Sequence, residues 1–452
     1  MSLPRYPAYK DSGVAWLGEV PGHWEVKPFY SVAAEREEPN IGMQEDNLLS
    51  LSYGRIIQKD INSNDGLLPE SFETYQVIRP GDIVFRLTDL QNDKRSLRTA
   101  LVEETGIITS AYVASKPTNI EPRYLSQLLR AYDVTKVFYS MGGGLRQSMK
   151  FSDLKRLPTL LPPPEEQTAI AAFLDRETGK IDALVAEQER LVTLLKEKRQ
   201  AVISHAVTKG LNPAAKMKDS GIEWLGEVPE HWEVKRLGYL CKKIGSGKTP
   251  SGGAEVYSED GILFIRSQNV YDEGLRLDDV VFISEGIDAE MPWSRVLPGD
   301  ILLNITGASL GRTCLVPEEF QAANVNQHVC IIRLEDPSQR DFVALVIKSL
   351  CVKTQIEAAQ NGAAREGLNF EQISKLILAL PPFEDQTAIA AFLGRETAKL
   401  DALTAEARRA IELLKERRSA LISAAVTGKI DVRSLSPTPL PQAGEGRSLE
   451  VA

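Results

Sequence analysis

Residues 167–174 read QTAIAAFL, and residues 386–393 repeat all eight letters 219 positions later. The triplet RET follows each copy at the same distance, at 176–178 and again at 395–397. A repeat of this length, with its spacing preserved, indicates that a segment of the chain is duplicated.

Each copy lies in a proline-free stretch, 165–208 or 384–427, that begins after consecutive prolines. Apolar residues recur there in alternating steps of three and four, the heptad pattern of a helix that packs along another helix. The residues of this seam are Leu174, Ile181, Leu184, Leu191, Leu195 and Val202 in the first stretch and Leu393, Leu400, Leu403, Leu414 and Leu421 in the second. Each stretch is therefore predicted to be one helix of roughly 65 Å, at about 1.5 Å per residue.

A helix of this length cannot bury its apolar stripe alone. The expected partner of each copy is the other copy, in an antiparallel coiled coil. Two unrelated surface helices are the alternative, which the duplicated register disfavours.

A second duplication, which we call the tryptophan motif, lies at 11–27 and 219–235. It reads DSGVAWLGEVP followed by HWEVK in the first copy and DSGIEWLGEVP followed by HWEVK in the second, at an offset of 208. A period of this size is too long for a solenoid repeat. It predicts two homologous halves in tandem, each with a tryptophan motif, a variable body and a long helix.

The tryptophan motif offers aromatic and imidazole side chains, but no clear ligand set. Trp16 and Trp24 are expected to pack against the body that follows, with stacking on a ligand as the alternative. His23 and His231 have no carboxylate or cysteine nearby in the sequence at ligand spacing, so we interpret them as packing or capping residues.

The overall composition is that of a folded protein of two or three domains. The chain has 452 residues, 43% hydrophobic and 25% charged, which is ample for several cores. No apolar run approaches the roughly eighteen residues of a membrane span, and no signal-peptide pattern is present, so we expect a cytoplasmic protein without membrane contact. The four cysteines all lie in the second half without a C-x-x-C pair, which favours reduced core thiols over a zinc site or disulfides.

The charge balance limits the kind of nucleic-acid contact that the chain can make. The formal net charge is −9, which counts against a nonspecific polyanion binder but not against a reader of specific DNA. Residues 27–156 hold seventeen Lys/Arg and seventeen Asp/Glu, so the first body is neutral.

Between the repeats, two bodies at 28–160 and 236–379 show short β-rich runs broken by Gly, Pro, Asn and Asp, and then one helical run. The expected strands are 48–51, 75–78, 82–87 and 107–113 in the first body and 261–265, 300–305 and 329–334 in the second; the expected helices are 122–139 and 340–360. Each body is predicted to be a compact α+β domain.

Both bodies end on a small-residue loop with one arginine, Arg146 after three glycines and Arg365 after GAA. Such a loop suits close approach to a phosphate or a base edge. The alternative is a turn whose arginine pairs with a carboxylate. Residues 431–452 are expected to be a disordered tail.

Motifs for catalysis are missing. GSGKT at 245–249 resembles the end of a phosphate loop, but Lys242 stands where the first glycine is required. No G-x-G-x-x-G or H-E-x-x-H sequence is present, and no cofactor is expected. The sequence indicates a binding protein, not an enzyme.

With its duplicated motifs and long helices, the chain resembles the specificity subunits of type I restriction–modification systems. The resemblance covers residues 11 to about 430. It rests on LPPPEEQ at 161–167 and LPPFEDQ at 380–386 before the long helices, on NITGASLGR at 304–312 with ANVNQH at 323–328, and on WLGEVP at 16–21 with Trp24.

The resemblance implies an α+β fold in which a pair of long antiparallel coiled-coil helices separates two target-recognition domains. After an N-terminal segment (1–27), the domains would be 28–160 and 236–379, the helices 161–210 and 380–430, and the linker with the second tryptophan motif 211–235. Each domain would read half of a split double-stranded DNA site. Two modification subunits, carrying S-adenosylmethionine and methylating adenine, would dock on the helices, and restriction/motor subunits would join them.

The two domains differ after their equivalent strands, so the implied site is asymmetric. The residues that we expect to contact DNA are Gln91, Asn92, Lys94, Arg95, Arg98 and Arg146 in the first domain and Asn304, Ser309, Arg312, Asn324, Asn326, Gln327 and Arg365 in the second. For each of them a loop-stabilising polar contact is the alternative. A noncatalytic scaffold with two protein-binding domains on a coiled coil is the alternative function, and the sequence specifies neither the bases, the gap, nor whether restriction accompanies modification.

Overall fold

A computed structural model describes residues 3–62, 69, 71–88, 90, 97–141, 149–360 and 367–435. The chain divides into two compact units, the first formed by Met1–Gln188 with Arg409–Ala452 and the second by Glu189–Arg408. Within the described residues, no helix is long and apolar enough to cross a membrane.

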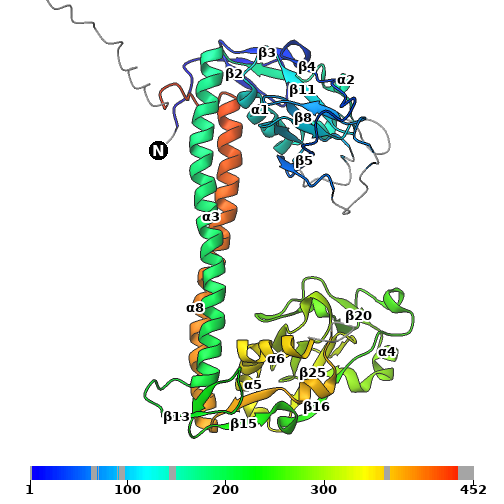
Figure 1. The fold of residues 1–452 in the computed structure, drawn as a ribbon, viewed down its shortest axis with the longest axis vertical. Helices are drawn as coiled ribbons and strands as arrows, with labels where there is room; N and C mark the ends of the chain where they lie inside the picture. Colours follow the sequence, from blue (N-terminus) through cyan, green and yellow to red (C-terminus); the bar gives the residue numbers. More distant parts are fainter. Residues whose placement is uncertain are drawn as a thin grey trace, which may run out of the picture. The chain divides into compact units, whose positions relative to one another are not determined.

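In the first unit, the tryptophan motif is a hairpin joined to the strand that precedes the first long helix. Strands β1 (Tyr9–Asp11) and β2 (Glu19–Pro21) pair antiparallel, and β3 (Glu25–Pro28) pairs with β12 (Pro158–Leu161). The beginning and the end of the first body are thereby held together (Figure 1).

The body of the first unit is built on a four-stranded antiparallel sheet. Its order is β4 (Ala33–Glu35), β11 (Val113–Pro117), β8 (Ile83–Phe85), β9 (Thr99–Leu101). Two smaller pairs adjoin it, β5 (Leu49–Ser52) with β6 (Arg55–Gln58) and β7 (Gln76–Ile78) with β10 (Gly106–Ile108).

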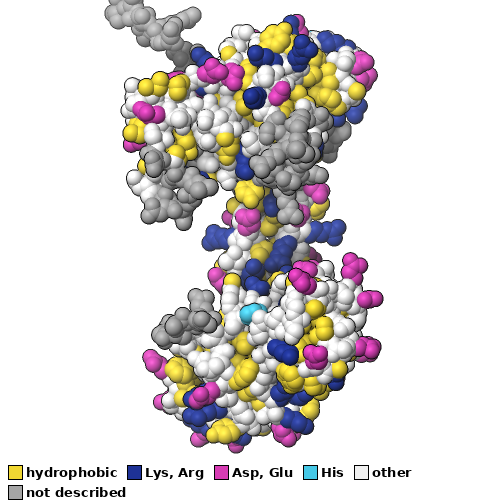
Figure 2. Space-filling model, turned by 90° about the vertical axis from the view of Figure 1, so that its right-hand side faces the viewer, with side chains coloured by type: hydrophobic (Ala, Val, Ile, Leu, Met, Phe, Trp, Pro, Cys, Tyr) yellow, Lys and Arg dark blue, Asp and Glu magenta, His cyan; other side chains and the backbone are white. Residues whose placement is uncertain are grey.

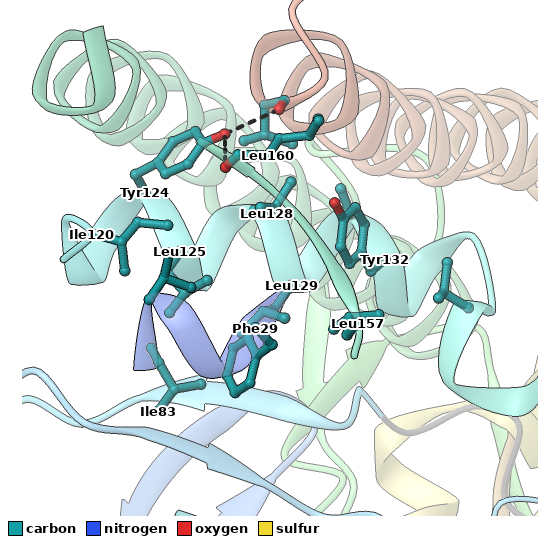
Figure 3. Packing of buried hydrophobic residues seen from close by; sticks show 14 of the residues in the cluster. Phe29, Ile83, Ile120, Tyr124, Leu125, Leu128, Leu129, Tyr132, Leu157 and Leu160 are labelled. Carbon is teal, nitrogen blue, oxygen red and sulfur yellow. Dashed lines mark hydrogen bonds between the residues drawn. The ribbon is translucent and has the colours of Figure 1, made fainter. Parts of the chain in front are cut away.

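Helix α1 (Pro122–Val134) covers this body and buries its apolar face (Figure 3). The hydroxyl of Tyr124 lies 3.2 Å from the carbonyl oxygen of Leu160 and 3.4 Å from that of Val426. Tyr124 therefore joins α1 to β12 and to the chain at Val426.

Two predicted boundaries in this body are wrong. The run 107–113 is not one strand but the end of β10, a turn and the beginning of β11. The predicted helix 122–139 ends at Val134, and a 3-10 turn at Val137–Ser140 follows Lys136, which has a positive φ of 64°.

The second unit repeats this plan. A hairpin of β13 (Met217–Asp219) and β14 (Glu227–Pro229) precedes β15 (Glu233–Arg236), which pairs with β26 (Ile377–Leu380). The main sheet has the order β16 (Cys241–Ser246), β25 (Val329–Leu334), β22 (Ile301–Asn304), β23 (Thr313–Leu315), which matches β4-β11-β8-β9.

This unit also holds a second sheet and a broken helix. The sheet has the order β20 (Val281–Ile283), β17 (Ile262–Ile265), β24 (Ala323–Val325), β21 (Arg295–Val296). The predicted helix 340–360 is two helices, α5 (Arg340–Lys348) and α6 (Leu350–Gln360), because Ser349 between them has an extended backbone. The remaining elements of the two units are α2 (Phe151–Leu154), β18 (Val270–Tyr271), β19 (Gly274–Leu275), α4 (Glu285–Glu290) and α7 (Phe370–Ser374).

The long helices form as predicted, as α3 (Pro164–Lys209) and α8 (Phe383–Val426). In the first unit the beginning of α3 packs with the end of α8: Leu174 and Ile422 share one core, and Arg418 Nε donates to Asp182 Oδ1 at 2.9 Å.

In the second unit the end of α3 packs with the beginning of α8. Val207 and Leu393 share a core there, and Arg199 Nε donates to Asp401 Oδ1 at 2.9 Å. The two helices are therefore antiparallel within each unit, as predicted. Gly210 and Gly428, with φ of 75° and 72°, follow the helix ends, where a left-handed residue stops a helix.

The predicted seam is wrong at three leucines. Leu184 is 51% exposed, Leu403 49% and Leu191 42%, whereas Leu174 and Leu393 are buried. All three occupy the heptad position that lies three residues after the position held by Leu174, Ile181, Leu195, Leu393 and Leu400, and those five side chains are buried. Only one of the two predicted heptad positions therefore lies consistently in the helix–helix contact.

The tryptophan motif corrects one interpretation and confirms another. His23 Nε2 lies 2.6 Å from Glu166 Oε1, and His231 Nε2 lies 2.9 Å from Asp385 Oδ2, so each histidine has a carboxylate partner distant in sequence. Both tryptophans pack against the body as predicted: Trp24 is buried, and Trp16, although 45% exposed, lies edge-on to Tyr132.

The cysteines and the C-terminal segment complete the description. All four cysteines are free, and three are buried, while Cys241 is half-buried. The predicted tail begins too early, because Val432 is buried in the core of the first unit and Asp431 N donates to Pro4 O at 2.9 Å. Residues 436–452 lie outside the described residues.

Candidate nucleic-acid interface

A cavity of the second body lies beyond the end of β22. After Asn304 the chain pairs at Thr306 with Gly367 and turns through Gly307–Ser309 before β23. The cavity has a volume of about 390 Å³ and is lined by Ser267, Gln268, Tyr271, Thr306, Gly307, Ala308, Ser309, Arg312 and His328. Two of the predicted contacts, Ser309 and Arg312, are thus brought together here.

Two arginines lie against one aromatic ring beside this cavity. Cζ of Arg276 is 3.7 Å and Cζ of Arg312 is 4.8 Å from the ring centroid of Tyr271. Neither guanidinium has a carboxylate partner among the residues that the structure describes. Both remain able to bind an anion or a base edge.

Other arginines of the same body are already neutralised. Arg333 Nε lies 2.7 Å from Asp300 Oδ1, and Arg295 Nη2 lies 2.5 Å from Asp288 Oδ2. Figure 2 shows basic and acidic side chains interspersed over the visible face, consistent with the balanced charge. The two arginines on Tyr271 therefore stand out by their lack of a partner, not by a surrounding basic patch.

A chain of hydrogen bonds fixes the predicted contact Gln327 near the same cavity. Thr249 Oγ1 donates to Gln327 Oε1 at 2.5 Å, Gln327 Nε2 lies 3.0 Å from His328 Nε2, and His328 Nδ1 lies 2.5 Å from Thr306 Oγ1. If the Gln327 amide donates to Nε2, the neutral imidazole carries its proton on Nδ1 and donates it to Thr306. Gln327 is exposed, and its amide keeps one N–H free to point outward.

The GSGKT stretch belongs to this surface and not to a phosphate loop. Gly247 N donates to Asn326 O at 3.3 Å, and a Cβ at Gly247 would overlap the carbonyl oxygen of Val325. The glycine is required because the chain passes close to the turn after β24. That close passage brings Thr249 to Gln327.

Three predicted contacts in this body stay predictions, and the structure shows their side chains buried and hydrogen-bonded within the fold. Asn304 Nδ2 donates to Ser267 O at 2.8 Å, Asn324 Nδ2 donates to Asp288 Oδ1 at 2.5 Å, and Asn326 Oδ1 accepts from His328 N at 3.1 Å. These asparagines shape the loops around the cavity, which was the alternative reading of each.

The first body has a cavity at the same end of its equivalent strand. Met149 N donates to Leu87 O at 2.9 Å, and Leu368 N donates to Ile305 O at 2.8 Å in the second body, so Thr88 corresponds to Thr306. The cavity next to Thr88 measures about 530 Å³, and its charged lining residues are Glu35, Arg36, Glu37, Glu38 and Lys150. The two cavities share a position but not their chemistry.

Most predicted contacts of the first body fall where the structure gives no description. Gln91, Asn92, Lys94, Arg95 and Arg146 lie outside the described residues, as does Arg365 in the second body.

Arg98 is described, and its predicted DNA contact stays a prediction. Its side chain is fully buried, with Nη1 donating to Thr88 O at 3.0 Å and Nε to Tyr139 Oη at 3.3 Å. Its guanidinium therefore anchors the start of the loop at Thr88 to the end of the body and does not reach the surface.

The sequence analysis missed Tyr271, Arg276, Gln268 and His328. Arg276 lies only five residues beyond Tyr271, across the β18–β19 hairpin, and that hairpin is the one local signal that could have found the pair. Arg312 joins them from another hairpin, which no local pattern reveals. Among the described residues, no group of His, Cys, Asp and Glu side chains could hold a metal ion.

Known proteins resemble this chain in sequence and fold. Residues 229–413 match the model of the type I restriction modification DNA specificity domain. The EcoBI specificity subunit of Escherichia coli is 26% identical over 63% of this chain and 61% of its own, and the MjaIX specificity subunit of Methanocaldococcus jannaschii is 23% identical over 93% and 96%.

A solved structure extends this similarity to the fold. It comes from work on complex assembly and conformational transition of the type I restriction–modification system, and it superposes with a TM-score of 0.66. The match has 18% identity and covers 90% of this chain and 98% of that one. At this identity it supports the fold alone.

Proposed function

Because the chain belongs to the specificity-subunit family of type I restriction–modification systems, we propose that its two bodies each read one half of an asymmetric, bipartite DNA site. The observation that carries this proposal is the pair of cavities beside Thr88 and Thr306. They lie at the ends of equivalent strands, but the first is lined by three glutamates together with Arg36 and Lys150, and the second by Gln268, Arg312 and His328 without any carboxylate. Unlike side chains at equivalent positions would select unlike half-sites.

In the second body, four side chains suit DNA contact: Ser309, Arg312 and Gln327, as predicted, and Arg276 in addition. Arginine and glutamine make bidentate hydrogen bonds to guanine and adenine edges, and serine and arginine also bind phosphates. In the first body, Gln91, Asn92, Lys94, Arg95 and Arg146 remain proposals from the sequence, as does Arg365 in the second.

We further propose that the long helices dock two modification subunits and that the chain itself is the noncatalytic component. Support comes from exposed leucines at duplicated positions. Leu184 and Leu403 are 51% and 49% exposed, and Leu194 and Leu413, again 219 residues apart, are 50% and 55% exposed. Leu184 and Leu413 lie in the first unit, and their counterparts Leu403 and Leu194 lie in the second. Each unit therefore presents an equivalent pair of exposed leucines, which suits a partner present in two copies. Adenine methylation would belong to that partner, and restriction/motor subunits would join the assembly.

The helices would also set the distance between the half-sites. Inserting one heptad into both α3 and α8 lengthens each helix by about 10 Å. The tolerated gap in the DNA site should then grow by about three base pairs, at about 3.4 Å per base pair. An unchanged gap would remove the helices from this role.

The test of the whole proposal is methylome sequencing of a host with and without this chain, its modification subunit being present in both. A two-part adenine-methylated sequence that disappears with the chain is expected. Selection from random duplexes by the purified complex should enrich the same sequence. If neither experiment yields a two-part sequence, the scaffold with two protein-binding domains becomes the better account.

A further inference from the structure

We infer that Arg312 reads a guanine edge in the half-site of the second body, that Arg276 binds a neighbouring phosphate, and that Tyr271 holds both guanidinium groups in place. This inference rests on the proposed function and assigns roles within that DNA-reading surface. It depends on three observations: the two arginines have no carboxylate partner among the described residues, the hairpin of Tyr271 is fixed, and only Arg312 lines the cavity.

The first step is that neither arginine is neutralised within the fold. Among the described residues, no carboxylate forms an ion pair with Arg276 or Arg312, whereas Arg266 of the same body has Asp279 at 3.4 Å. A guanidinium that lies on an aromatic face keeps its N–H groups at the ring edge available for hydrogen bonds. The pair is therefore suited to an acceptor from outside the chain.

The second step is that the hairpin carrying the ring is tied to the segment that carries Arg312. Tyr271 ends β18, and its neighbour Asp272 accepts from Thr313 N at 3.0 Å through Oδ1 and from Lys353 Nζ at 2.6 Å through Oδ2. Thr313 directly follows Arg312. Asp272 is therefore a positioning residue that fixes the hairpin of Tyr271 against the segment that carries Arg312.

The third step separates the roles of the two arginines. Arg312 lines the cavity together with Thr306, Ser309 and His328, whereas Arg276 does not line it and is exposed at its edge. A side chain inside a concave, polar surface suits a base edge that enters it, and one at the rim suits the backbone that passes by. Guanine offers two acceptors, O6 and N7, that match the fork of a guanidinium, while lysine lacks this geometry.

The experiment uses the full complex with the modification subunits, the selected DNA site and a set of duplexes in which each base pair is changed singly. Arg312→Lys should keep the charge but reduce discrimination at one G·C position by roughly tenfold or more, leaving other positions unchanged. Arg276→Gln should weaken binding to all duplexes about equally and lower the slope of log affinity against log salt by about one.

Three further variants separate positioning from folding. Tyr271→Leu should produce both effects together, whereas Tyr271→Phe, which keeps the ring, should produce neither. Arg295→Lys, at an exposed arginine that is already paired with Asp288, is the matched control and should change neither specificity nor salt dependence. Hydrogen exchange of β22 and β25 would identify a variant that is misfolded.

The outcomes are distinct. If the wild-type complex prefers no bipartite sequence, the proposed function fails. If it does prefer one, but Arg312→Lys leaves discrimination intact at every position, or Arg276→Gln leaves the salt slope unchanged, the inference fails and the proposed function stands.

Discussion

The two tryptophan motifs meet the beginnings of their long helices in the same way, but with different polar networks. In the first unit the buried Glu166 carboxylate accepts from Trp24 Nε1 at 2.9 Å and from the Tyr6 hydroxyl at 3.2 Å, with His23 2.6 Å and Arg433 3.5 Å away. Burial and the nearby Glu166 charge raise the pKa of Tyr6, so its hydroxyl remains a donor. We call this cluster the first joint.

The equivalent place in the second unit, the second joint, is less complete. Asp385 stands where Glu166 stands in the first unit, is one methylene shorter and is 46% exposed, and it pairs only with His231 among the described residues. Trp232 Nε1 and Gln386 Oε1 are buried there with no hydrogen-bond partner in the described chain, whereas the corresponding Gln167 Oε1 accepts from Glu121 N at 2.7 Å.

The difference shows what duplication preserved. The apolar contact was kept, since Trp24 and Trp232 are both buried. The polar network depends on Tyr6 and Arg433, which lie near the two ends of the chain and outside the repeated segments. An unsatisfied buried polar group costs about 1–3 kcal/mol, so the second joint should open more easily than the first.

The largest effect is expected from removing the shared acceptor. Glu166→Ala leaves the Trp24 and Tyr6 donors buried without an acceptor, and should lower the local stability of the first joint by about 3 kcal/mol. Asp385→Ala removes only an exposed pair and should cost less than about 1 kcal/mol. Hydrogen exchange of β3 and β12, compared with β15 and β26, measures the two separately. Equal losses would contradict the comparison.

A smaller effect is expected at the duplicated leucines. Leu184→Asp and Leu403→Asp each place a charge at one of the proposed docking positions, and each should weaken the binding of one modification subunit by about tenfold, or about 1.4 kcal/mol. Leu277→Asp changes a comparably exposed leucine that is not duplicated and serves as the control. Calorimetric titration with the modification subunit gives affinity and stoichiometry, and unchanged binding of two copies in both variants would exclude these leucines from the interface.

The second joint should be repairable. Asp385→Glu adds the methylene that brings the carboxylate toward Trp232 Nε1, and one new buried hydrogen bond should add about 1 kcal/mol of local stability. Slower hydrogen exchange in β15 and β26 is the expected result. Asp385→Asn is the control, because it keeps the side-chain length of the aspartate. Exchange as fast as in the wild type would mean that length is not what the second joint lacks.

The smallest effect concerns the thiols, which all lie in the second unit. Burial raises the pKa of Cys330 from 9.0 to about 12, so its thiolate fraction near pH 8 should be about a thousandfold lower in the folded protein than in the unfolded chain. Alkylation should therefore follow opening of the second unit. Asp385→Glu should slow it and Glu166→Ala should leave it unchanged; rapid alkylation of Cys330 in the folded wild type would contradict its burial.

The repeated, regularly spaced segments could be predicted from the sequence, whereas contacts between residues far apart in the chain could not. Proline-free heptads predicted α3 and α8 to within one residue at each end, and the duplication indicated that the two helices pair with each other. The seam failed at Leu184, Leu191 and Leu403, which share one heptad position, while Leu174, Leu195 and Leu393 at the other position are buried. The prediction of one strand over 107–113 was wrong because a turn at 109–112, without glycine or proline, separates two short strands.

The candidate site was predictable only in its general location. Asn304 and Asn324 were chosen for their hydrogen-bonding chemistry, but their burial depends on neighbours far along the chain. Arg312 and Gln327 lie at the surface, yet what fixes them, Tyr271 for one and Thr249 for the other, lies 41 and 78 residues away in sequence. Contacts of this kind arise from the fold, and no local spacing encodes them.

The central claim is that two unlike bodies read two unlike half-sites, and exchanging one body tests it most directly. A chain in which residues 28–160 also replace 236–379 should direct methylation, in the complex, to a sequence containing the first half-site twice. Methylome sequencing would show this replacement of the second half-site. Methylation that still falls on the original asymmetric sequence would contradict the account.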